Sequence, residues 1–148
     1  MKRALPALFL ALALAASLVW TKRQAFLVHA AVRGDVAILN ALLGLGADPN
    51  STATGSSPLY TAVWYHRLQV AAALIARGAN VNAVEPSGVT PLLAAAASGD
   101  DAIVGLLLAH GASRHVKGHC GTPLDVARSN HHPSTVTLLL STPSRPAP

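Results

Sequence analysis

Histidine and cysteine, the side chains that bind transition metals most often, gather in the last third of the sequence. They are His110, His115, His119, Cys120, His131 and His132. A structural zinc site needs four such ligands, and the sequence contains neither a second cysteine nor an HExxH pattern. His115 and His119 also fall in a loop of the repeat pattern described below. We therefore expect no metal site and no cofactor, and a His-rich metal-binding protein is the weakest alternative that we carry forward.

Catalytic side chains show no recognisable arrangement either. The sequence has no GxSxG elbow for a nucleophilic serine, and its serines, histidines and aspartates recur only in phase with the repeat. Gly44-Leu45-Gly46 ends a predicted helix, whereas a phosphate-binding loop follows a strand. The carboxylates expected at helix starts, where they stabilise the helix dipole, are Asp35, Asp100, Asp101 and Asp125. These patterns predict a protein that is not an enzyme and has no catalytic residue.

Residues 88–113 show the element that would position these side chains: two short helices joined by a tight turn. Thr90 can cap the first helix, and Pro91 suits its first position because that backbone N–H needs no helical partner. Gly99 suits the left-handed residue that ends this helix, and Gly111 suits the end of the second. A helix pair of this size cannot bury its own apolar faces, so it needs neighbours.

The same frame recurs along the chain at a regular period, which is the mark of a repeat architecture. Counterparts of the Thr90 start lie one period earlier, at Ser57, and one period later, at Thr122, and a degenerate copy starts at Ala25. The second helices end in similar motifs, namely Gly46-Ala47-Asp48, Gly78-Ala79-Asn80 and Gly111-Ala112-Ser113. Four phased copies with these starts and endings resemble the ankyrin repeat family.

This resemblance implies an all-α fold, a solenoid of stacked helix-turn-helix units with β-turn fingers. Within one domain of residues 25–140, the repeats are expected at about 25–56, 57–89, 90–121 and 122–140. Residues 141–148 are rich in proline and serine and predict a disordered tail. In the first repeat, we expect both Phe26 and Leu27 to pack inward. In the second, His66 replaces the usual glycine at the helix end, and histidine tolerates positive φ at some cost.

Residues 1–24 predict a segment that enters a membrane-targeting route. The uncharged run from residue 4 to residue 21 would be about 27 Å long as a helix, which is the lower limit for crossing a bilayer. Lys2, Arg3 and small residues within the run match a cleavable secretory signal. The run stays apolar up to Trp20, however, and tryptophan suits a membrane interface. We favour an uncleaved anchor, one hydrophobic N-terminal helix, and keep the cleavable signal as the alternative.

The expected location follows from these two interpretations. Basic residues flank the apolar run on both sides, so the positive-inside rule gives only a slight preference for a cytoplasmic N-terminus. With an uncleaved anchor, the protein would be a single-pass membrane protein with its repeats on the outer or periplasmic side. With a cleaved signal, it would be periplasmic or secreted.

The net charge of +5 overstates how basic the repeats are. Four of the eleven lysines and arginines flank the N-terminal run, which leaves seven basic and six acidic residues in the rest of the chain. A nucleic-acid-binding domain would carry a basic stripe on its folded part. This near balance predicts no nucleic-acid partner and favours a protein partner.

In the family that the sequence resembles, a concave groove and the finger tips contact protein partners. The matching positions here are Arg33, Thr54, Trp64, Tyr65, Ser87, Val89, Ser98, His119 and Asn130. Trp64 and Tyr65 are the expected anchors, because the repeat motif requires no large aromatic side chain there and both types are enriched at binding hot spots. The alternative is that the two rings cover the Ala-rich surface of a neighbouring repeat.

A second hypothesis places the contact with other proteins at the last predicted helix instead of the groove. Its apolar residues are Val136, Leu138, Leu139 and Leu140, and no further repeat is expected to cover them. The chain would then be a structural or regulatory subunit that docks through this helix into a second copy or a larger complex.

Overall fold

The computed structural model describes residues 19–20 and 22–141 of the chain. A helix occupies residues 22–33, and the helices that follow are α2 (Val36–Gly44), α3 (Pro58–Trp64), α4 (Leu68–Ala76), α5 (Pro91–Ser98), α6 (Asp101–Ala109), α7 (Pro123–Ser129) and α8 (Pro133–Ser141). Apart from an isolated bridge between Gly118 and Gly121, the described residues contain no β-structure. The predicted all-α class is confirmed for this part of the chain.

Most of the predicted N-terminal segment and of the predicted tail lies outside the described residues. Within residues 1–24, the structure describes 19–20 and 22–24, which are helical. Within residues 141–148, it describes Ser141, the last residue of α8. None of the helices in the described ranges is long and apolar enough to cross a membrane.

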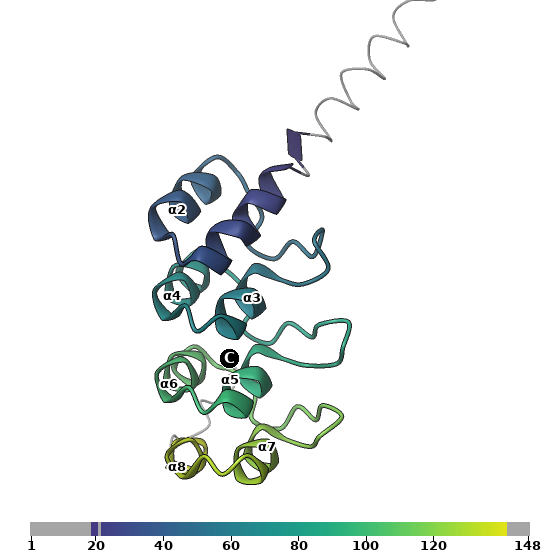
Figure 1. The fold of residues 1–148 in the computed structure, drawn as a ribbon, viewed down its shortest axis with the longest axis vertical. Coiled ribbons are helices and arrows are strands. Elements are labelled where there is room, and N and C mark those ends of the chain that lie inside the picture. Colours follow the sequence, from purple (N-terminus) through teal and green to yellow (C-terminus); the bar gives the residue numbers. More distant parts are fainter. Residues whose placement is uncertain (1–18, 21, 142–148) are drawn as a thin grey trace, which may run out of the picture.

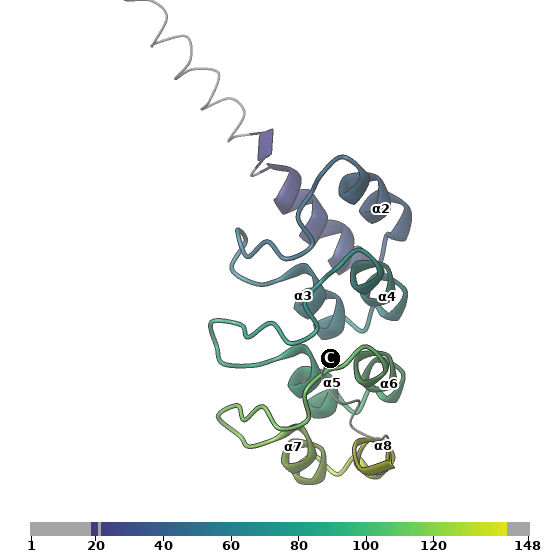
Figure 2. The ribbon, with the colours of Figure 1, turned by 180° about the vertical axis from the view of Figure 1, so that it is seen from behind.

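The helices form two rows that run along a stack (Figure 1). The first row consists of residues 22–33, α3, α5 and α7, and the second of α2, α4, α6 and α8, so that each successive helix pair, here called a unit, adds one helix to each row. α3 packs on α4 within its unit and on α5 of the next, and α5 packs on α7 in the same way. Loops 45–57, 77–90 and 110–122 project beside the first row, as Figure 2 also shows.

Side-chain caps start the first-row helices α3, α5 and α7. The hydroxyls of Ser57, Thr90 and Thr122 each accept a hydrogen bond from the backbone N–H three residues later, and a proline follows each cap. Asp125 Oδ2 accepts from the Thr122 N–H at 2.9 Å, which completes a capping box. Because a cap of this kind contributes about 1 kcal/mol, these motifs fix where each unit starts, as the sequence predicted.

Two asparagine side chains join successive loops. Asn50 Nδ2 donates to Gly78 O at 3.0 Å, and Asn50 Oδ1 accepts from Asn80 N at 2.7 Å. Asn82 makes the same pair of bonds one unit later, to Gly111 O at 3.1 Å and to the N–H two residues beyond it at 2.7 Å. Each amide therefore satisfies two backbone groups of the next loop and fixes the spacing between units.

The turn between the two helices of a unit requires one residue at positive φ. Gly34 and Gly99 adopt φ values of 80° and 70°, and His66 and His131 adopt 56° and 60°. The expectation of positive φ at His66 is confirmed, and His131 is the same exception in the last unit. A residue other than glycine in this region costs roughly 1–2 kcal/mol, because its Cβ approaches the following carbonyl oxygen.

Relieving this strain at His131 is expected to stabilise the protein. His131→Gly and His131→Ala remove the same exposed imidazole, but only glycine adopts a φ of 60° without the Cβ penalty. After allowing for the greater entropy of glycine in the unfolded chain, we expect His131→Gly to exceed His131→Ala by about 1 kcal/mol in free energy of unfolding by urea. Equal stabilities of the two variants would contradict the assigned turn.

The core lies between the two rows and consists mostly of aliphatic side chains. Its largest fully buried members include Leu27, Leu39, Leu59, Leu74, Leu92, Ile103 and Leu107. Leu27 packs inward as predicted, but the prediction for Phe26 was wrong, because this side chain is 62% exposed. Its counterpart in the next unit is Pro58, which is buried. Among the described residues, no helix pair covers Phe26 in the same way.

A threonine connects the third unit to the fourth. The side chain of Thr135 is fully buried, and its Oγ1 donates to Asp101 Oδ1 at 2.5 Å. Hydrogen bonds from Ser134 and Thr135 favour the ionised carboxylate and hold the pKa of Asp101 below its ordinary value of 3.8. Because the folded pKa is the lower one, ionised Asp101 stabilises the folded state above the unfolded pKa. This stabilisation is lost as the pH falls through the folded value.

We therefore expect Asp101→Asn to reduce the pH dependence of stability. The variant should be less stable than the parent chain at neutral pH, and the difference should shrink as the pH falls below 3.8. Urea unfolding between about pH 3 and pH 7 measures this difference. Asp35→Asn is the matched control, because the Asp35 side chain makes no capping hydrogen bond. A loss of stability in Asp101→Asn that is constant over the whole range would show that the carboxylate bond is not responsible.

Candidate functional site

Three aromatic side chains lie together near the end of α3. Trp64 is 62% exposed and Tyr65 is 46% exposed. The rings of Tyr60 and Trp64 stack with their centroids 6.0 Å apart and their planes at 27°. Together with Ser56 and Thr61, the three aromatic residues line a hollow of about 170 Å³, and we call these five residues the aromatic patch. The patch offers a large apolar contact area with hydroxyl groups among the rings.

Three members of the patch, Tyr60, Ser56 and Thr61, were not predicted as site residues, and Tyr60 is the aromatic one. Its spacing of four residues from Trp64 could have identified it, since positions i and i+4 of a helix share a face. Burial, and then the negative charge of Glu85, raises the pKa of the Tyr60 phenol above its ordinary value of 10.0. The phenol is therefore neutral at physiological pH and can donate a hydrogen bond to a partner.

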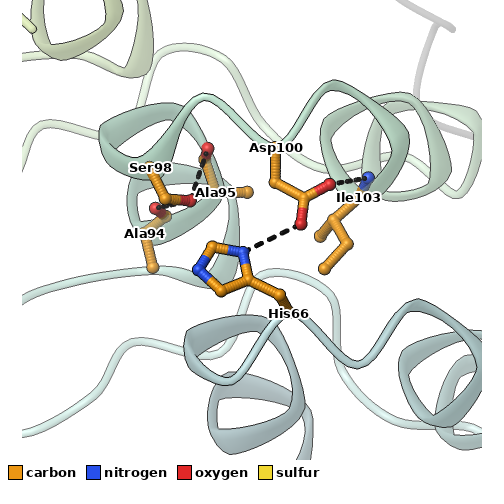
Figure 3. A network of polar contacts seen from close by, with 6 residues as sticks. All are labelled: His66, Ala94, Ala95, Ser98, Asp100 and Ile103. Atoms are coloured by element: carbon orange, nitrogen blue, oxygen red, sulfur yellow. Dashed lines mark hydrogen bonds and ion pairs between the residues drawn. The ribbon is translucent and has the colours of Figure 1, made fainter.

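The turn that follows the aromatic patch is tied to the units on both sides. Arg67 Nε donates to Val32 O of the first unit at 2.9 Å. His66 Nδ1 lies 3.0 Å from Asp100 Oδ2 of the third unit, and Asp100 Oδ1 accepts from the Ile103 N–H at 3.1 Å (Figure 3). The patch thus stands beside backbone that is held from two directions, so binding there would order little additional chain.

Trp64 and Tyr65 stay exposed in the stack, at 62% and 46%. Val63, one residue before Trp64, is buried in the core, whereas the two aromatic side chains extend into solvent. This exposure favours the prediction that they are available to a partner over the alternative that they cover an Ala-rich surface. Their contact with a partner stays a prediction.

Three other predicted residues take the position of Tyr65 in their own units. Arg33, Ser98 and Asn130 each lie at or beside the end of a first-row helix and are exposed. Ser98 Oγ donates to two carbonyl oxygens of its own helix, at 3.3 and 3.2 Å (Figure 3). Asn130 Nδ2 donates to Ala97 O of the preceding unit at 2.7 Å. Part of the hydrogen-bonding capacity of Ser98 and Asn130 is therefore used inside the protein.

The remaining predicted residues lie on the loops. Thr54, Ser87 and His119 are exposed, each on a different loop. Val89 is partly buried and packs against the core. Of the nine residues predicted from the sequence, Trp64 and Tyr65 line one common hollow, and the others are distributed along the first row and the loops.

The histidine-rich third loop does not form a metal cluster in the described part of the chain. His115, His119 and Cys120 are exposed there. No three histidine, cysteine or carboxylate side chains among the described residues come together in a way that could hold a metal ion. His132, outside this loop, has a structural contact instead, since its Nε2 lies 3.1 Å from Ala97 O.

The stacked helix pairs define a helical repeat protein with an exposed aromatic patch. The chain matches the family model of ankyrin repeats in three copies over residues 8–85 and that of the ankyrin repeat over residues 87–119. It therefore belongs to the ankyrin repeat family, whose members serve in general as non-enzymatic interaction scaffolds. The first match begins inside the predicted N-terminal segment 1–24, and α7 and α8 lie beyond the second match.

Part of this sequence is also similar to one stretch of a curated protein. Over 94 residues, the chain is 36% identical to alpha-latroinsectotoxin-Lt1a of Latrodectus tredecimguttatus. The aligned part covers 62% of this chain but only 7% of the toxin. The similarity therefore concerns one stretch of a far longer protein.

Proposed function

We propose that this chain is a non-enzymatic interaction module that binds a protein partner through the aromatic patch. The exposure of Trp64 and Tyr65 is the observation that carries this proposal. Large aromatic side chains dominate binding hot spots, because they bury much area at little cost in conformational entropy. The bonds from His66 and Arg67 to the adjacent units support it further, since a rigid patch loses little freedom on binding.

Crosslinking at the patch tests this proposal. A photoreactive amino acid in place of Tyr65, in the full chain in its native host, should crosslink to one defined protein. The matched control places the same amino acid at Leu45, which is also exposed but lies outside the patch. Crosslinks to the same proteins from both positions would contradict a specific patch.

We also propose that the chain is held at a membrane or exported across one. The support comes from the sequence, in which the uncharged run from position 4 to position 21 lies between two basic pairs. Mass spectrometry of the mature N-terminus tests the two forms of this proposal. An intact Met1 or Lys2 supports the anchor, a new terminus within or shortly after the run supports a signal, and an intact terminus on a protein recovered in the cytosol contradicts both.

A second candidate function uses the end of the stack. Residues of α7, α8 and the turn between them, among them Arg128, Val136 and Thr137, line a hollow of about 600 Å³. Leu140 on α8 is 61% exposed. The chain would then be a structural or regulatory subunit, with this end covered by a second copy.

Light scattering after size-exclusion chromatography separates the two candidates. A dimer that Leu140→Lys dissociates would support the second one, and a monomer would contradict it. Leu140 is the suitable position because the adjacent Leu139 is buried, so that a lysine at Leu139 would unfold the helix instead.

A further inference from the structure

The helix of residues 22–33 has an exposed face that the aromatic patch does not use. Lys22, Ala25, Phe26, His29 and Arg33 are exposed and follow one another at three- or four-residue spacing, apart from the adjacent pair Ala25 and Phe26, which places them on one side of the helix. Four of them, from Lys22 to His29, line a hollow of about 300 Å³. We call these five residues the first-helix face.

The first-helix face combines an apolar centre with basic groups. Phe26 lies between Lys22 and Arg33, and residues 22–33 contain no aspartate or glutamate. The other basic residue of this helix, Arg23, donates to Leu45 O at 2.6 Å and so belongs to the packing of its own unit. Lysine and arginine beside an exposed aromatic ring can keep their charges in water while their aliphatic stems extend the apolar surface.

This composition fits the surface of a lipid bilayer. Interfacial helices place an aromatic or apolar stripe at the boundary between headgroups and acyl chains, and their basic residues contact anionic headgroups. Val19 and Trp20, which belong to the uncharged run of residues 4–21, are also exposed. We propose that the first-helix face rests on an anionic bilayer surface. The inference rests on the proposed membrane placement and is independent of the aromatic patch.

A fluorescent label tests the contact in the full chain. Cys120 is the only cysteine, so Cys120→Ser gives a background for single-cysteine variants. Ala25→Cys places an environment-sensitive label on the first-helix face, and Ala41→Cys places the same label on α2, at an alanine that is also exposed. In vesicles of phosphatidylcholine and phosphatidylserine, we expect nitroxide lipids to quench the label at position 25 more strongly than the label at position 41, because the apolar face of an interfacial helix lies at the boundary between headgroups and acyl chains.

Charge reversal tests the anionic character of the surface. Lys22→Glu should lower the partition coefficient onto the vesicles, measured by quenching at position 25 against lipid concentration, by about fivefold per unit of charge. This factor corresponds to one cation near an anionic leaflet. Lys117→Glu is the matched control. Lys117 is exposed on the third loop, so this substitution makes the same change of charge at a site outside the first-helix face. Equal effects of the two reversals would overturn the assignment.

Flotation with the vesicles distinguishes this inference from the membrane placement. If the chain floats but the labels at positions 25 and 41 are quenched equally, the first-helix face is not a lipid contact and the placement stands. A blue-shifted label at position 25 that the lipids do not quench means that a second copy or another part of the chain covers the face, which overturns the inference. A chain that does not float overturns this inference and the anchored form of the membrane placement, whereas the exported form is decided by the mature N-terminus.

Discussion

Replacing Trp64 with alanine is expected to weaken the affinity for the protein partner by about 2 kcal/mol or more, which is roughly a thirtyfold rise in Kd. The indole is 62% exposed, and it stacks on the ring of Tyr60 in its own helix. Its removal therefore costs contact area with a partner but little packing within the folded chain. Titration of the crosslinked partner, once identified, measures the change in Kd.

Two measurements show whether the effect of Trp64→Ala is specific. Leu45→Ala removes another large exposed apolar side chain, 67% exposed and outside the aromatic patch, and should leave Kd unchanged. The helical circular dichroism and the urea midpoint of Trp64→Ala should match those of the parent chain. An unchanged Kd, or a loss of folding in Trp64→Ala, would contradict a role in binding.

Gly99→Ala is expected to cause the largest loss of stability among single substitutions in the turns. Gly99 has a φ of 70°, and a Cβ there would lie only 2.7 Å from Cε1 and Cγ of His132. The left-handed conformation costs roughly 1–2 kcal/mol for alanine. Displacing His132 also breaks its bond to Ala97 O, which contributes about 1 kcal/mol. We therefore expect a loss of about 3 kcal/mol in urea unfolding.

Gly78→Ala is the control that separates the two causes. Gly78 has a φ of 85°, but no atom lies within 4 Å of a Cβ built there. It should lose only the conformational part, roughly 1–2 kcal/mol. If Gly78→Ala and Gly99→Ala lose the same stability, the contact between His132 and Gly99 makes no energetic contribution.

The sequence predicted the local features of this fold because their causes are local. A Thr-Pro start places a capping hydroxyl and a pre-formed φ within two residues, so Thr90 and Thr122 could be recognised without knowing any neighbour. Phe26 could not be placed in the same way. Its burial depends on whether another unit lies against it, which is a property of the stack rather than of the helix.

In the candidate site too, the local features could be predicted from the sequence, and the contacts between units could not. Trp64 and Tyr65 were recognisable because the repeat needs no aromatic side chain at either position. The bond from His66 to Asp100 was not, because its partners are 34 residues apart in the sequence and meet only when two units stack in register. The charge of Glu85 beside Tyr60 likewise comes from loop 77–90, which follows α4. Pairings of this kind depend on three-dimensional register, which one sequence does not display.

The asparagine joints between loops have a consequence for how such a chain can change in length. In the pair of hydrogen bonds that joins the first two loops, Asn50 contributes its side chain. Its partners, the Gly78 carbonyl and the Asn80 N–H, are backbone groups that nearly any sequence provides. An internal duplication of one repeat period would therefore copy a complete connector, with no compensating substitution elsewhere. Recombination could lengthen or shorten the protein by whole periods and leave the aromatic patch intact.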